Sequence, residues 1–168
     1  NLNKLFGSDR VFDVPTSENA LTGIGVGTAI SGIKTVITHQ RLDFALLSMD
    51  QIINSAAKWR YMFGGKFSVP ITIRMIIGRG WGQGPTHSQS LSSLFCNIPG
   101  LKVVMPTFAK DAKRLLISSI SDPNPVIFLE HRWLHHITDK DFIKKLPKKL
   151  TFSNIVKKGK DLTIISMS

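Results

Sequence analysis

Cysteine is almost absent from this chain of 168 residues, which contains only Cys96. A single cysteine excludes an internal disulfide framework and fits a reducing compartment: the cytoplasm or, in a eukaryote, the mitochondrial matrix. Its apolar neighbours predict a small buried residue in preference to a nucleophile. Long hydrophobic runs are missing too. No stretch approaches the ~20 apolar residues that cross a bilayer, so we expect no membrane association.

An initiator methionine and a basic-then-apolar leader are also lacking, because the chain opens Asn1-Leu2-Asn3-Lys4. We therefore expect no signal peptide. A predicted strand over residues 161–166 runs almost to the last residue. We expect the chain to be a piece of a longer protein, with residues 161–168 as the first strand of a truncated second domain.

Acidic side chains are scarce, with 11 Asp and Glu against 22 Lys and Arg, which gives a net charge of +11. Such an excess raises the possibility of nucleic-acid binding. However, eight lysines lie between residues 140 and 160, where Phe142 and Phe152 are the only aromatic residues. A stacking surface for bases is therefore poorly supported. We interpret residues 138–160 as a solvated lysine-rich linker and expect no nucleic-acid partner.

Short β-branched runs alternate along the remaining sequence with segments of helical periodicity. Strands are predicted at residues 11–14, 35–38, 69–75, 101–105 and 126–129, and helices at 18–30, 44–62, 88–95 and 110–120. This alternation is typical of a parallel sheet between two layers of helices. The predicted fold class is therefore α/β, a three-layer parallel sheet with helices on both faces, occupying residues 1–137.

Two of the predicted helices have distinctive features. Ser17 is placed to cap the first helix, whose interior glycines, Gly23, Gly25 and Gly27, predict close contact with a neighbouring element. The helix over 44–62 is predicted to bury a stripe at helical spacing. That stripe contains Leu46, Met49, Ile53 and Ala56 or Ala57.

Unusual residues gather where ligands bind in parallel sheets, beyond the carboxyl ends of the strands. One such segment is Pro15-Thr16-Ser17-Glu18, and a second is the polar run from His39 to Phe44. The third is a glycine-rich loop that continues as Gly84-Pro85-Thr86-His87-Ser88-Gln89. These three segments are the candidate site.

Four motifs in order resemble the beta subunit of the thiamine-diphosphate-dependent component of 2-oxo acid dehydrogenases. They lie in residues 9–27, 49–58, 84–106 and 122–130. The resemblance spans nearly the whole chain. It implies the thiamine-diphosphate-binding fold of the pyrimidine-domain type, also found in transketolases, where the Gly-Pro-Thr-His segment occurs too.

The resemblance implies roles for four residues at the site. Thr16, Glu18 and Phe44 would contact thiamine diphosphate, with Glu18 hydrogen-bonded to a pyrimidine ring nitrogen and so favouring the imino tautomer of the ring. His87 matches the active-site histidine, which shuttles protons near the substrate carbonyl. Two of these residues also have purely structural interpretations: Glu18 as an acidic residue that complements the helix dipole, and His87 as a helix-capping residue. Phe44 is equally well interpreted as a core residue.

The resemblance further implies a potassium ion held at the positions that match the known ligands: Ile71, Ser119, Asp122 and Asn124. A plain turn also explains Asp122-Pro123-Asn124-Pro125. The family's Gly-Asp-Gly and Asn-Asn signature for diphosphate and magnesium is missing from the sequence. The resemblance therefore implies an alpha subunit that holds that half of the cofactor, in an alpha-two beta-two assembly that contains a second beta subunit.

The expected activity is oxidative decarboxylation of pyruvate or a branched-chain 2-oxo acid, with acyl transfer to the lipoyl group of an acyltransferase. The isolated fragment would be inactive. Acetoin-type substrates share these motifs, and a transketolase-like sugar-phosphate enzyme or a non-catalytic domain of the same fold remain alternatives. We expect no metal at His131, His135 and His136, because no carboxylate or cysteine completes a ligand set. Gly23-x-Gly25-x-Gly27 lacks the third glycine of a dinucleotide fingerprint.

Overall fold

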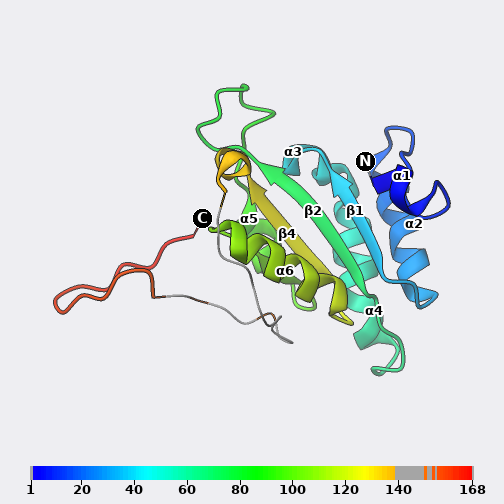
Figure 1. Cartoon of the computed structure of the whole chain (residues 1–168). Coiled ribbons are helices and arrows are strands. Elements are labelled where there is room, and N and C mark those ends of the chain that lie inside the picture. Colours follow the sequence, from blue (N-terminus) through cyan, green and yellow to red (C-terminus); the bar gives the residue numbers. More distant parts are fainter. Residues whose placement is uncertain (1, 139–149, 151–152, 154, 168) are drawn as a thin grey trace.

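The computed structural model of the chain describes residues 2–138, 150, 153 and 155–167. Its centre is a parallel sheet flanked by helices (Figure 1). Most of the predicted lysine-rich linker, residues 138–160, lies outside the described residues. In the described part, no helix is long and apolar enough to span a membrane.

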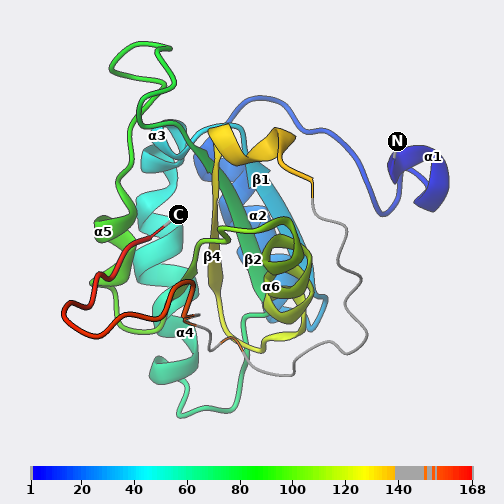
Figure 2. The ribbon, with the colours of Figure 1, turned by 60° about the vertical axis from the view of Figure 1, so that its left-hand side comes forward.

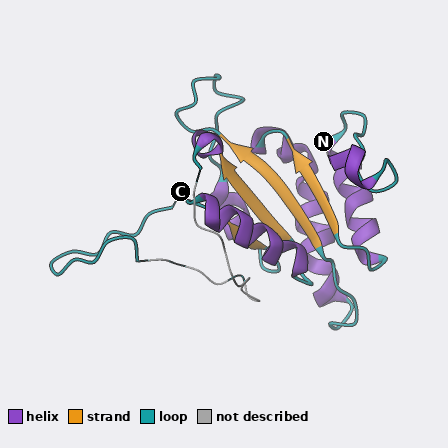
Figure 3. Ribbon diagram, in the orientation of Figure 1, coloured by secondary structure: helices purple, strands orange, loops and turns teal. Residues whose placement is uncertain are grey.

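The sheet contains four parallel strands in the order β1-β2-β4-β3. Their bounds are β1 (Thr35–His39), β2 (Ile71–Ile77), β3 (Lys102–Val104) and β4 (Val126–His131). Figure 3 shows the strands pointing the same way, so their carboxyl ends share one edge. The predicted α/β class with a parallel sheet is confirmed.

Helices cover both faces of the sheet, as Figure 2 shows. The helical elements are α1 (Leu2–Phe6), α2 (Glu18–Ile30), α3 (Leu42–Ala45), the 3₁₀ helix η1 (Leu46–Ser48), the π-helix η2 (Gln51–Ala56), α4 (Ala57–Met62), α5 (Ser92–Cys96), α6 (Ala109–Ser121) and the 3₁₀ helix η3 (Arg132–His136). Alternate residues of β2 face opposite layers. Ile73 joins the core beneath α2 and η2, whereas Arg74 lines a hollow beside α6.

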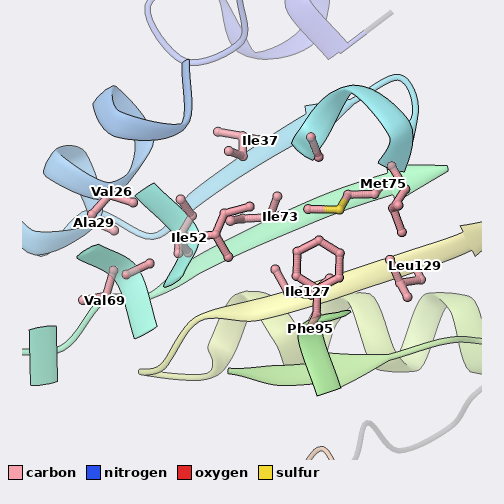
Figure 4. Packing of buried hydrophobic residues seen from close by; sticks show 14 of the residues in the cluster. Val26, Ala29, Ile37, Ile52, Val69, Ile73, Met75, Phe95, Ile127 and Leu129 are labelled. Carbon is pink, nitrogen blue, oxygen red and sulfur yellow. The ribbon is translucent and has the colours of Figure 1, made fainter. Parts of the chain in front are cut away.

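The main core lies between the sheet and the layer formed by α2, α3, η2 and α5 (Figure 4). Its strands contribute Ile73 and Met75 from β2 and Leu129 from β4, and Phe95 reaches in from α5. All four side chains are fully buried. Burial of this apolar surface, at roughly 25 cal/mol per Å², holds these helices against the sheet.

The glycines of α2 divide into two kinds. A Cβ built on Gly25 would lie 3.1 Å from Ile37 Cγ2 and 3.2 Å from Ile71 Cδ1. Gly27 has no heavy atom within 4 Å of such a Cβ. Close contact is thus confirmed at Gly25, against strand side chains, and is wrong at Gly27. Ser17 is the N-cap residue of α2, as predicted, but its side chain makes no capping hydrogen bond.

The predicted helix over 44–62 is a succession of α, 3₁₀ and π turns, and its buried stripe differs from the prediction. The prediction is confirmed at Ala56 and Ala57, which are buried, and Met49 packs against the core, whereas Leu46 is exposed and Ile53 only half-buried. Asp43 is also buried. The main buried stripe is Leu42, Ala45, Ser48, Ile52 and Ala56. Their spacing is three residues through the 3₁₀ turn and four through the π-helix, because the two turn types wind differently. A uniform 3.6-residue period therefore misplaced the stripe. The predicted end at Gly64-Gly65 is confirmed, with φ of 60° and 79°.

Several local predictions are wrong. Residues 11–14 form no strand, and Phe12 is 64% exposed. Residues 161–167 are likewise exposed and form no strand, although their place at the start of a second domain remains a prediction. Both runs have strand-like composition, but a strand needs a neighbour to complete its backbone hydrogen bonds. The helix predicted over 88–95 is confined to α5, where Cys96 is exposed instead of buried.

Candidate active site

Three segments meet at the carboxyl edge of the sheet, as the sequence predicts. They are the start of α2, the segment that leaves β1 toward α3, and the long loop that leaves β2. Figure 1 shows this loop and α3 at the same end of the sheet. The parallel register of β1 with β2 pairs His39 with Met75 and so brings the two strand ends together.

Glu18 is the first residue of α2 and is half-buried, while Thr16 lies exposed in the loop before it. One turn further along the helix, Thr22 Oγ1 donates to the Glu18 carbonyl oxygen at 2.8 Å. The same hydroxyl lies 3.0 Å from His39 Nε2. His39 is only 3% exposed, and burial lowers its pKa, an effect partly offset by the negative charge of Glu18. Glu18 therefore starts its helix beside a buried imidazole.

Phe44 and His87 are brought into direct contact, with ring centroids 5.1 Å apart in an edge-to-face arrangement. This geometry is the favourable one for aromatic pairs. Both rings are half-buried, so Phe44 is not an enclosed core residue. The polar residues before Phe44 tie the two segments together: Asp43 Oδ1 accepts from Gln89 Nε2 at 2.8 Å and from Gln89 N at 3.3 Å.

Glycines shape the loop that presents His87. Gly80, Gly82 and Gly84 have φ of 76°, 82° and 85°, which other residues rarely adopt. Contacts with other segments hold this loop in place. In one of them the ring of Trp81 lies 5.1 Å, centroid to centroid, from the ring of Trp133 in η3, directly after β4.

Two further contacts hold the same loop. Arg132 Cζ lies 5.1 Å from the centre of the Trp81 ring, which is a cation–π arrangement. Arg41 donates a hydrogen bond to Gln83 from the segment after β1. The loop is thus fastened on both sides before it reaches His87, a function of Trp81 and Arg132 that the sequence analysis did not anticipate.

Two buried polar atoms of this region have no hydrogen-bond partner within the described part of the chain: Asp43 Oδ2 and Arg41 Nη1. Buried polar atoms are normally satisfied, so these two are available to hydrogen-bond a polar molecule if the segment opens toward it. Together with a carboxyl group, an imidazole and a half-buried aromatic ring, they suit a flat heterocycle that carries ring nitrogens and an amino group. The aminopyrimidine of thiamine diphosphate has this chemistry, and the residues present fit it.

The four predicted potassium ligands lie at the opposite, amino-terminal edge of the sheet. There Asp122 Oδ2 pairs with Lys102 Nζ at 2.5 Å, and Asp122 Oδ1 accepts from Asn124 N at 2.9 Å. Ser119 Oγ donates to Leu115 O at 2.7 Å, and Ile71 is buried in β2. The Asp122 carboxylate thus already has a lysine partner. Potassium binding remains a prediction, and no chemistry proposed below depends on it.

The histidines after β4 make local contacts. His131 Nδ1 accepts from Trp133 N at 3.3 Å, and His135 Nε2 lies 3.5 Å from Glu130 Oε2. Glu130 also pairs with Arg74 Nε at 2.6 Å. Across the described residues, no three His, Cys, Asp or Glu side chains are grouped so that they could hold a metal ion.

Comparison with known proteins identifies the family that this fold and site define. Residues 2–136 match the transketolase pyrimidine-binding domain, so the chain belongs to that family. A solved split-gene transketolase, an inactive beta4 tetramer, has the same fold, with a TM-score of 0.64 at 19% identity. The alignment covers 79% of this chain and 40% of that chain.

Within the family, the chain is homologous to beta subunits of 2-oxo acid dehydrogenases and an acetoin oxidoreductase. It is 40% identical to a mitochondrial pyruvate dehydrogenase E1 subunit beta-1 of Arabidopsis thaliana, over 97% of this chain and 46% of that protein. It is 42% identical to the beta subunit of an acetoin:2,6-dichlorophenolindophenol oxidoreductase of Cupriavidus necator, over 94% and 47%. A mitochondrial 2-oxoisovalerate dehydrogenase subunit beta 2 of Arabidopsis thaliana is 38% identical over 95% and 45%. The chain thus spans about half the length of these relatives.

Proposed function

We propose that the chain supplies the pyrimidine-binding half of a thiamine-diphosphate site in the beta subunit of a 2-oxo acid dehydrogenase. The observation that carries this proposal is the contact between Phe44 and His87 at the edge of the sheet where Glu18 begins α2. Identities of about 40% to pyruvate, 2-oxoisovalerate and acetoin enzymes over nearly the whole chain support the reaction class. They do not distinguish among these substrates.

Each residue has a role that follows from its chemistry. Glu18 holds a proton against a ring nitrogen of the pyrimidine, and Phe44 provides a flat apolar surface for the ring. Thr16, exposed just before α2, is placed to contact the same ligand. His87 moves a proton at the oxygen of the substrate carbonyl. Thiamine diphosphate, when bound, supplies the carbon nucleophile that the protein lacks.

The same proposal assigns the other half of the site to a partner. An alpha subunit holds the diphosphate and its magnesium ion, a second beta subunit completes an alpha-two beta-two assembly, and a lipoyl-bearing acyltransferase accepts the acyl group. Support comes from the relatives, which are themselves beta subunits, and from the lack of a Gly-Asp-Gly segment in this sequence. We place the assembly in the cytoplasm or the mitochondrial matrix.

Replacement of Glu18 by glutamine in the assembled enzyme tests the proposal. Glutamine keeps the size of the side chain but cannot hold the acidic proton, so we expect the turnover of 2-oxo acid to fall by roughly 10² to 10⁴-fold. The melting temperature should stay close to that of the wild type. Asp9→Asn removes an exposed acid outside the sheet and serves as the matched control. Undiminished turnover in the Glu18→Gln enzyme would refute the proposal and favour a non-catalytic domain of the same fold.

A further inference from the structure

A buried histidine lies behind Glu18 and has no role in the proposed mechanism. His39 is the last residue of β1 and is 3% exposed, next to Thr22, which is fully buried. A titratable ring at such a place in the core requires an explanation, because burial of an imidazole is costly unless its nitrogens are satisfied.

The hydrogen bonds around Thr22 determine which nitrogen of His39 carries the proton. The Thr22 hydroxyl has one hydrogen, which it donates to the Glu18 carbonyl oxygen at 2.8 Å. At the contact with His39 the same oxygen must therefore accept, so the hydrogen of that 3.0 Å bond belongs to His39 Nε2. In a neutral imidazole, Nδ1 then carries the lone pair. A chain of two directed hydrogen bonds thus runs from the ring through Thr22 to the residue that starts α2.

We propose that His39 is a positioning residue for Glu18: its Nε2–H fixes the Thr22 hydroxyl, which in turn fixes the first turn of α2 and the direction of its leading carboxyl group. This inference rests on the proposed function and deepens it. The neutral ring serves the purpose because only the Nε2–H tautomer satisfies Thr22. Chains of buried hydrogen bonds of this kind stiffen a site more than their single members do.

The electrostatic surroundings agree with a neutral ring that senses Glu18. Burial lowers the pKa of His39, which keeps the ring uncharged near neutral pH, and the carboxylate of Glu18 opposes this effect. Arg41 and Asp43 are the charged residues of the segment that follows β1. Asp43 accepts a hydrogen bond from Gln89, and Arg41 donates one to Gln83. Glu18 on α2 is thus the charge to which His39 responds.

Nuclear magnetic resonance of the full chain with labelled histidine tests this coupling without any cofactor. The five histidines give few signals, and the nitrogen shifts of His39 should identify the Nε2–H tautomer. Glu18→Gln should move the titration midpoint of His39 downward, because it removes the charge that favours the protonated ring. Glu130→Gln, which removes an acid next to His135, is the matched control and should leave His39 unchanged. A Nδ1–H tautomer, or a His39 midpoint indifferent to Glu18→Gln, would overturn the inference.

Variants of the assembled enzyme test the functional consequence. His39→Phe fills the space but donates no hydrogen bond, and we expect kcat to fall about tenfold, as for the loss of one buried hydrogen bond. His39→Gln retains a side-chain donor, so it should restore most of that loss. Equal kcat values for His39→Phe and the wild type would overturn the positioning role even where Glu18→Gln abolishes turnover. Full turnover of Glu18→Gln would instead refute the proposed function, and the resonance experiment would still decide the coupling.

Discussion

Single side chains at this site are defined by their neighbours more than by their own type. Phe44 stacks edge-on against His87, although the two lie 43 positions apart in the sequence, and Asp43 accepts hydrogen bonds from Gln89, 46 positions away. Glu18 and His87 are predictable from motifs because each has distinctive neighbours in the chain. The part played by His39 is not, because it depends on a hydroxyl in another element. The signal available was a histidine at the end of a buried strand.

Burial of His39 makes stability depend on pH in a predictable direction. The unfolded ring takes up a proton as pH falls below its ordinary value of 6.5, whereas the folded ring, with a lowered pKa, resists it. The free energy of unfolding should therefore decrease on acidification, from about pH 6.5 down to the lowered pKa of the folded ring. Urea unfolding at a series of pH values measures this slope.

The same series on His39→Gln should give a shallower slope, since the variant has no ring to protonate at that position. His136→Gln removes an exposed imidazole and is the control. Equal slopes in the wild type and His39→Gln would show that His39 does not cause the acid sensitivity.

Among the elements, α2 was predictable in its bounds, and the irregular helix from Leu42 to Met62 was predictable only in its extent. A hydrophobic period reveals that a segment is helical, but it averages over local changes of winding. The switch from 3₁₀ to π turns places Ser48 in the core, which no apolar pattern indicates. The sheet order was not predictable either, because strand pairing joins residues far apart in sequence.

Two glycines of α2 should respond in opposite ways to alanine. Gly27→Ala meets no neighbour, so it should stabilise the fold by about 1 kcal/mol through helix propensity. Gly25→Ala places a methyl group 3.1–3.2 Å from Ile37 and Ile71, which must move inside a filled core. We expect Gly25→Ala to be destabilising. Chemical denaturation of the two variants measures both effects, and similar stabilisation by both would show that α2 is not held against the sheet at Gly25.

The tryptophan contact at the end of β4 should hold the loop that carries His87. Trp133→Leu removes the ring that lies against Trp81, a contact worth about 0.5–1.5 kcal/mol for an aromatic pair. Amide hydrogen exchange of residues 79–88 should accelerate accordingly, up to about tenfold. Tyr61→Leu, which removes an exposed ring from α4, is the control and should leave these amides unchanged. Unaltered exchange in Trp133→Leu would mean that Arg41 and Asp43 suffice to hold the loop.

At the scale of the whole molecule, the α/β class was predictable from the alternation of strands and helices, and the family from four motifs in register. The expectation of a strand at residues 11–14 was wrong for a physical reason, whereas residues 161–168 as the start of a second domain remain a prediction. Val11-Phe12-Asp13-Val14 has the composition of a strand, yet composition supplies no partner, and β1 is paired on one side by β2 alone. The site itself likewise presents unpaired polar atoms at Arg41 and Asp43.

Titration of thiamine diphosphate with magnesium into the chain, alone and together with an alpha-type partner that carries the Gly-Asp-Gly segment, tests the central claim most directly. In the proposed assembly this polypeptide binds the pyrimidine and another binds the diphosphate. Calorimetry should therefore show weak or undetectable binding to the chain alone, and tight, magnesium-dependent binding once both polypeptides are present. Tight, magnesium-dependent binding to the isolated chain would contradict the account.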